Sequence, residues 1–212
     1  MTRRLAVVAG AVVVIGCVPR LSPLTGAPAP VNAIPRTAVP EGHTKIVFEW
    51  QLNDLTLTSR GDGAARIAYP DSVRLDFFLA GGLGGGSAVL IRDSLTAPGG
   101  DMVRKLVPPP TLLWAALGWA ALPNLPDTVV RLEDGVLRAD IGRPVTWRFT
   151  FHGDTLVRAD RVSDGKVQEW VERVDSTRVR YRNEGARRSL MLSITRREGG
   201  SEFDASIWHV GR

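Results

Sequence analysis

The chain has 212 residues, with 27 Lys and Arg against 22 Asp and Glu and a net charge of +5. This length fits one domain plus appendages, because a domain takes about 100–200 residues. The basic residues are interleaved with acidic and apolar ones, as in 178–182, and form no block with aromatic platforms. We therefore expect solvated strand faces and no nucleic-acid binding.

Residues 1–16 have the pattern of an export signal. Arg3 and Arg4 precede the apolar run LAVVAGAVVVIG, which is typical of a secretory signal rather than of a membrane span. The four residues from Val14 to Cys17, VIGC, resemble the bacterial lipobox, in which a small residue precedes a cysteine that is diacylated and becomes the new N-terminus. We expect residues 1–16 to be removed and Cys17 to carry a lipid anchor.

Cys17 is the only cysteine in the chain, which excludes an internal disulfide. Lipidation accounts for a lone thiol in an exported protein; the alternatives are a plain cleaved signal with an incidental cysteine, or an N-terminal anchor helix. The next residue is Val18, not the aspartate that marks inner-membrane retention in well-studied Gram-negative bacteria. The lipobox resemblance thus implies a lipoprotein at the periplasmic face of the outer membrane.

The segment 18–42 is rich in Pro and Ala and carries little charge. Such a sequence stays extended and semi-rigid, at roughly 3 Å per residue. We expect residues 17–43 to form a lipidated tether that holds a domain of residues 44–212 away from the membrane.

From Thr44 onward, short runs of alternating apolar and polar residues predict antiparallel strands. The clearest run is Val145–Phe151, which places Trp147 and Phe149 on the apolar face. Similar runs cover 46–50, 73–79 and 190–194, and turn signals stand at 61–63, 134–135, 153–154, 164–165 and 199–200. About nine to eleven such strands must curl to cover their apolar face. We expect a mainly β fold, a strongly curved antiparallel sheet that forms an open or half barrel.

One stretch predicts a helix, Thr111–Leu122, inside the sequence PPPTLLWAALGWAALPNLP of residues 108–126. It is apolar on every side apart from Thr111 and Gly118, so it must be buried or must border a cavity. The prolines before it suit a first turn, and we expect Pro123 to end it. The stretch is too short for a bilayer, which needs about 20 residues. A lid or plug over the sheet is expected.

The residues from Gly63 to Phe78 are similar to the second and third strands of the LolA/LolB superfamily of lipoprotein carriers. In that family a small residue, an apolar strand, a Pro-Asp turn and an Arg-Leu-acid strand follow in order, matched here by Ala68, by 70–71 and by 74–76. The loop 79–84 resembles the loop that in LolB carries an exposed leucine, matched most closely by Leu83.

The predicted helix also resembles the helix of that superfamily, through its Leu-Gly and Leu-Pro elements at 117–118 and 122–123. The resemblance is closest to the outer-membrane receptor LolB and implies an open barrel with a helical lid, whose cavity takes acyl chains. Leu83 would then touch a membrane or partner; the alternative is an ordinary hairpin tip whose leucine folds back on the sheet. We expect the ligand site to comprise Phe77, Leu112, Leu113, Trp114, Leu117, Trp119, Trp147 and Phe149.

Residue patterns of catalysis are missing. The chain has no Gly-x-Ser-x-Gly motif, and His43, His152 and His209 lie in no metal-ligand spacing. We therefore expect no catalytic residue, no metal and no cofactor, and a binding protein rather than an enzyme.

The sequence is compatible with two main functions. The leading one is a monomeric, lipid-anchored periplasmic protein that accepts or carries acyl-bearing cargo such as lipoproteins or lipids, with a periplasmic lipoprotein carrier as a partner. The alternative is a structural or sensor envelope lipoprotein with a filled core and a protein partner. A cavity between helix and sheet would separate the two, because periodicity alone predicts only which side chains face inward.

Overall fold

The computed structural model describes residues 18–82, 84–98, 100–124 and 126–209. The predictions on the export signal, on lipidation at Cys17 and on the loop residue Leu83 lie outside these residues.

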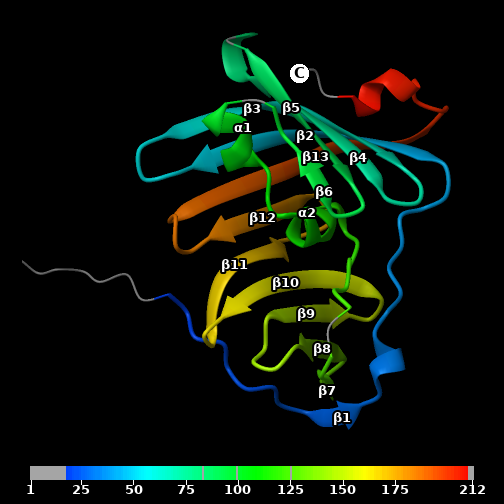
Figure 1. Cartoon of the computed structure of the whole chain (residues 1–212), viewed down its shortest axis with the longest axis vertical. Helices are drawn as coiled ribbons and strands as arrows, with labels where there is room; N and C mark the ends of the chain where they lie inside the picture. Colours follow the sequence, from blue (N-terminus) through cyan, green and yellow to red (C-terminus); the bar gives the residue numbers. More distant parts are fainter. Residues whose placement is uncertain (1–17, 83, 99, 125, 210–212) are drawn as a thin grey trace, which may run out of the picture.

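Thirteen strands form one antiparallel sheet, two more than the upper estimate from the sequence. The strands are β1 (Ala27–Ala29), β2 (His43–Asn53), β3 (Thr58–Ala68), β4 (Ser72–Leu79), β5 (Gly85–Ile91), β6 (Ser94–Thr96), β7 (Thr128–Glu133), β8 (Val136–Ile141), β9 (Trp147–His152), β10 (Thr155–Ser163), β11 (Lys166–Arg173), β12 (Arg178–Asn183) and β13 (Arg188–Gly200). Their spatial order is β1-β7-β8-β9-β10-β11-β12-β13-β2-β3-β4-β5-β6. The sheet stays open between β1 and β6, as a curved half barrel (Figure 1).

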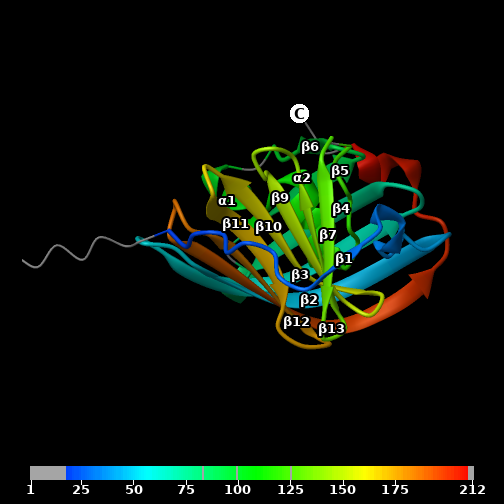
Figure 2. The same cartoon turned by 90° about the horizontal axis from the view of Figure 1, so that it is seen from below.

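Two α-helices lie on the concave side of this sheet, α1 (Asp101–Leu106) and α2 (Pro110–Leu117). Three short 3-10 turns complete the described elements: η1 (Val31–Ala33), η2 (Ala80–Gly82) and η3 (Ala205–Trp208). The sequence predicted only α2, because α1 is a single short amphipathic turn with Val103 and Leu106 buried. Figure 2 shows α2 within the arch that the strands form.

The predicted helix is correct at its start and wrong at its end. Pro110 occupies the first turn, where a missing N–H costs nothing. The helix ends at Leu117 and not near Pro123, because Gly118 adopts a left-handed conformation with φ 103°. Its N–H donates to the Ala115 carbonyl oxygen at 3.0 Å, which closes the last turn.

The turn predicted at 61–63 is also wrong, since these residues lie inside β3. Gly63 stands opposite Phe48 on β2, and a Cβ at this position would overlap the Phe48 ring. The glycine therefore makes room for a neighbouring aromatic side chain rather than forming a turn. The turns predicted around Asp134 and Asp164 are confirmed, and both residues have positive φ angles of about 50°.

Residues 18–42 pack on the sheet instead of forming a free tether. β1 pairs with β7, and Arg20 bridges to Lys166 at the start of β11. Ile34 and Val39 are buried in the hydrophobic core. Figure 1 shows this segment, in blue, passing β1 and rising along the sheet to β2. The folded domain thus begins before the predicted boundary at Thr44.

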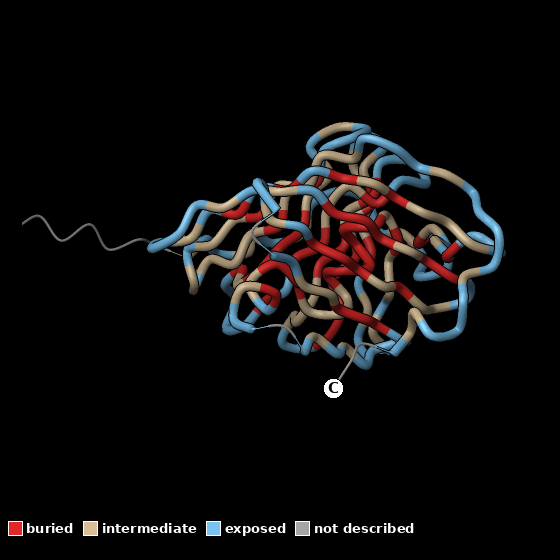
Figure 3. Tube along the Cα trace, turned by 90° about the horizontal axis from the view of Figure 1, so that it is seen from above, coloured by how far each residue is buried: buried red, intermediate tan, exposed pale blue. Residues whose placement is uncertain are grey.

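The alternation predicted for the strands separates a buried concave face from a charged outer face. On β2, Phe48 and Trp50 are buried whereas Glu49 and Gln51 are exposed. Figure 3 shows the buried residues gathered in the centre of the molecule. On the outer face charges pair between and along strands; Arg148, for example, donates to both Asp140 oxygens at 2.6 and 2.7 Å. Such pairs account for the interleaved charges of the sequence.

Candidate functional site

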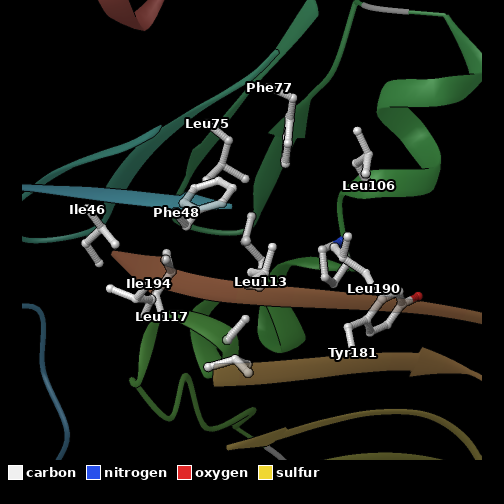
Figure 4. A pocket seen from close by; sticks show the side chains of 14 residues that line it. Ile46, Phe48, Leu75, Phe77, Leu106, Leu113, Leu117, Tyr181, Leu190 and Ile194 are labelled. Carbon is white, nitrogen blue, oxygen red and sulfur yellow. The ribbon is translucent and has the colours of Figure 1, made fainter. Parts of the chain in front are cut away.

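A small closed cavity lies between the sheet and the segment that covers it, which we call the roof (residues 101–117: α1, the linker 107–109 and α2). Its volume is about 20 Å³. Figure 4 shows side chains of the roof and of β2, β4, β12 and β13 converging on this space. The 14 lining residues are Ile46, Phe48, Leu75, Phe77, Leu106, Pro108, Leu113, Ala116, Leu117, Val179, Tyr181, Leu190, Leu192 and Ile194.

The lining is apolar because each contributing element turns one periodic face inward. On α2 the residues Leu113, Ala116 and Leu117 are spaced i, i+3 and i+4 and so share one side of the helix. The one polar group in the lining, the Tyr181 hydroxyl, donates to Glu169 Oε1 at 2.8 Å. Burial and the Glu169 carboxylate raise the pKa of Tyr181, so this phenol stays protonated.

Polar contacts hold the roof at two places, near the opposite ends of strand β2. Lys105 of α1 lies 2.9 Å from the carboxylate of Asp54, which follows β2, and Arg188 of β13 lies 3.5 Å from the same oxygen. The hydrogen bond from Lys105 lowers the pKa of Asp54 below its ordinary value. Trp114 of α2 donates from Nε1 to the carbonyl oxygen of Arg92, between β5 and β6, at 3.1 Å. Both contacts tie the roof to the strands across the cavity.

A hollow of about 500 Å³, the rim hollow, lies at the C-terminus of α2, beyond the end of the cavity that is away from Lys105. Its lining residues are Leu117, Gly118, Trp119, Asp154, Thr155, Leu156, Arg173, Ser176, Ile194 and Arg197. Leu117 and Ile194 line both spaces, so the cavity and the rim hollow adjoin at these side chains. Burial, and next the positive charge of Arg197, lower the pKa of the Arg173 guanidinium.

The structure divides the predicted ligand-site residues into three groups. Phe77, Leu113 and Leu117 line the cavity, and Trp119 lines the rim hollow. The other roof residues, Leu112 and Trp114, are buried but belong to neither lining.

Trp147 and Phe149 do not line the cavity, contrary to the prediction. Their rings stack on β9 at 6.2 Å between centroids. β9 is four strands away from β13 in the sheet, which places this pair in the core of the other half of the molecule. Alternation predicted the buried face correctly, but it carries no information about where along that face a cavity lies.

Several lining residues were not predicted as a site. Ile46, Phe48 and Leu190 were identified only as strand positions. Tyr181 was considered only as part of the charged segment 178–182, which was interpreted as a solvated strand face. The contribution of Leu106 depends on α1, a helix that was not predicted from the sequence. Helix α2 packs on β10, β11 and β12, and its cavity-facing side is therefore the side turned toward β2, β4 and β13.

The described ranges contain no group of three His, Cys, Asp or Glu residues placed to hold a metal ion. None of the helices described in this chain combines the length and hydrophobicity that a membrane span requires.

The fold is similar to that of a LolA superfamily protein from Nitrosomonas europaea. The TM-score is 0.50 at 10% identity, and the alignment covers 82% of this chain and 93% of that one. The fold is LolA-like. Two further structures align with lower TM-scores. A DUF1329 family protein from Desulfovibrio piger has a TM-score of 0.44 at 9% identity, and the alignment covers 80% of this chain and 90% of that one. A domain from Vibrio parahaemolyticus named for outer membrane lipoprotein sorting has a TM-score of 0.43 at 6% identity, with 79% and 89% of the two chains covered. No family model and no curated protein matches the sequence.

Proposed function

We propose that this LolA-like protein is a non-enzymatic carrier or acceptor that holds an acyl chain between the roof and the concave face of the sheet. The observation that supports this most directly is the cavity itself: its lining is apolar apart from the Tyr181 hydroxyl, and it lies under a roof made of two short helices. Each acyl methylene buried there contributes about 0.8 kcal/mol to binding.

Binding requires the roof to move, because a cavity of about 20 Å³ is far smaller than the roughly 300–1,000 Å³ of usual ligand sites. The ends of α2 suit a movement of the helix as a unit. Pro108 and Pro109 restrict the backbone before it, and Gly118 leaves the helix in a conformation that glycine adopts without strain. Displacing Leu113 and Leu117 from the sheet would join the cavity to the rim hollow.

The sequence supports a place in the bacterial envelope for this carrier. The export signal at 1–16 and the lipobox ending at Cys17 favour a lipid anchor at the periplasmic face of the outer membrane, where the protein would act as a monomer. Its cargo would be lipoproteins or lipids, received from a periplasmic carrier as by a LolB-type receptor. An acyl mass on Cys17 in the protein isolated from membranes tests the anchor, and an unmodified mature N-terminus would contradict it.

A second function is favoured by one observation, the small volume of the cavity. A nearly filled interior suits a structural or sensor lipoprotein that binds a protein partner on its surface and takes no ligand inside. The two functions differ in whether the roof opens for an acyl chain.

Binding of a fluorescent fatty acid to the non-acylated mature chain (residues 17–212) separates these functions. We expect Leu113→Asp to abolish binding, because a carboxylate in the apolar lining carries a large desolvation cost. Leu132→Asp is the matched control, since Leu132 lies exposed on β7, away from the cavity. Absence of binding by the parent, or equal binding by Leu113→Asp with an unchanged circular dichroism spectrum, would favour the structural role.

A further inference from the structure

The two ends of the cavity differ in how their cations are neutralised. At the closed end Lys105 and Arg188 share the carboxylate of Asp54. At the open end Arg173 and Arg197 form no ion pair and donate no side-chain hydrogen bond within the part of the chain that the structure describes.

Both rim arginines lie on the concave side of the sheet. Arg197 pairs in register with Ile46, which lines the cavity, and lies three positions beyond Ile194 on β13. Arg173 is the last residue of β11, beside the C-terminus of α2, and it is half-buried. The one carboxylate in the lining of the rim hollow, Asp154, is exposed and is not in ion-pairing distance of either guanidinium.

Two neighbouring cations repel each other, and a partly buried guanidinium without a counter-ion has lost hydration that nothing replaces. Burial and the charge of Arg197 both disfavour the charged form of Arg173, as the lowered pKa of this guanidinium indicates. An oxyanion between the two side chains would relieve this repulsion and would fit the planar fork of guanidinium donors.

The position of the rim arginines relates such an anion to the apolar cavity. Leu117 and Ile194 form the boundary between the cavity and the rim hollow. A chain attached to an anion at the rim would pass these two residues to reach the cavity.

We propose that Arg173 and Arg197 bind the headgroup of an anionic amphiphile, a carboxylate or phosphate joined to an acyl or alkyl chain that enters the cavity. This inference rests on the proposed carrier function and specifies its ligand. The polarity of the site follows: the headgroup stays at the rim hollow, near the C-terminus of α2, and the chain points toward the closed end at Lys105.

Calorimetry with ligands of one chain length tests the proposal on the non-acylated mature chain. The ligands are dodecanoate and dodecyl phosphate below their micelle concentrations, uncharged dodecanol below its solubility limit, and inorganic phosphate. We expect both anionic amphiphiles to bind at least ten-fold more tightly than dodecanol, and inorganic phosphate to bind much more weakly than dodecyl phosphate. Added NaCl should weaken the binding of the anions and not that of dodecanol.

Charge-removing variants assign the effect to the rim arginines. The double variant Arg173→Gln, Arg197→Gln should lose at least ten-fold in affinity for dodecanoate and dodecyl phosphate and keep its affinity for dodecanol. Arg60→Gln is the matched control, because Arg60 is an exposed arginine on β3 that lines a hollow of its own. The single variant Arg197→Gln, at an exposed residue, should also weaken the binding of both anions and not that of dodecanol, and it serves as the test if the double variant does not fold.

Three results would overturn the proposal: dodecanol that binds as tightly as dodecanoate, anion affinity that the double variant retains, or inorganic phosphate that binds as tightly as dodecyl phosphate. A parent protein that binds none of the amphiphiles, dodecanol included, would instead contradict the carrier function itself. The two failures are therefore distinguishable in one set of titrations.

Discussion

At the scale of single residues, burial alone does not identify the site. Phe149 and Leu113 are both buried, at 0% and 3% exposure, yet only Leu113 lines the cavity. The sequence predicted the inward direction of both side chains from periodicity. Which of them borders a void depends on packing between strands far apart in the chain, and a local pattern does not contain that information.

Truncating Phe149 to Ala should lower the free energy of unfolding by about 3–5 kcal/mol, because its ring is fully buried against Trp147 in a packed region. Affinity for an acyl ligand should stay the same, since β9 lies away from the cavity. Denaturant titration and a fatty-acid binding assay on the same preparation measure both quantities. A loss below about 1 kcal/mol would mean that this part of the interior is not packed as described.

Asp54 should make the stability of the protein depend on pH in the acid range. Its folded pKa lies below the ordinary value of 3.8, so its contribution is complete above that pH and is lost as the pH falls through 3.8 toward the lowered pKa. Asp54→Asn should therefore be less stable than the parent at pH 7, with a difference that shrinks on acidification toward pH 3. A difference that stays constant over this range in urea titrations would exclude the ion pairs with Lys105 and Arg188 as its cause.

At the scale of elements, the roof shows which helix features a local sequence pattern can predict and which it cannot. Its prolines and its apolar run predicted a buried helix, and α2 confirms this. The sequence placed the helix end at Pro123 because proline ends helices strongly, whereas the earlier Gly118 in a left-handed conformation ends it first. Helix α1 was not predicted, because its six residues are too few to show a helical period in the sequence.

Replacing Gly118 with Ala should destabilise the protein by about 1–2 kcal/mol, because a Cβ is strained in the left-handed conformation. The added methyl would also lie 3.1 Å from Arg173 Nη2, the flexible end of a side chain that can move. Gly200→Ala is the control; Gly200 lies exposed at the end of β13 with open space around it and no positive φ, so we expect a change within about 0.5 kcal/mol. Equal effects of the two substitutions on thermal unfolding would argue against Gly118 as the helix terminator.

At the scale of the whole molecule, the fold class was predictable and the arrangement was not. Many short alternating runs with one apolar helix indicate a curled sheet. The pairing of β13 with β2 joins residues more than a hundred positions apart, as in Leu190 with Leu52, and no local signal specifies it. The same holds for residues 18–42, whose composition suggests a tether although Ile34 and Val39 complete the core.

Native mass spectrometry of the mature chain with dodecanoate would show whether an acyl chain occupies the space between the roof and the sheet, as we propose. Ala116→Phe is the decisive variant, because Ala116 lines the cavity and a ring there would fill it at a cost of about 1–3 kcal/mol from overpacking. We predict a one-to-one complex for the parent and none for a folded Ala116→Phe protein. Equal binding by both proteins, or none by the parent, would mean that the acyl chain does not occupy this cavity.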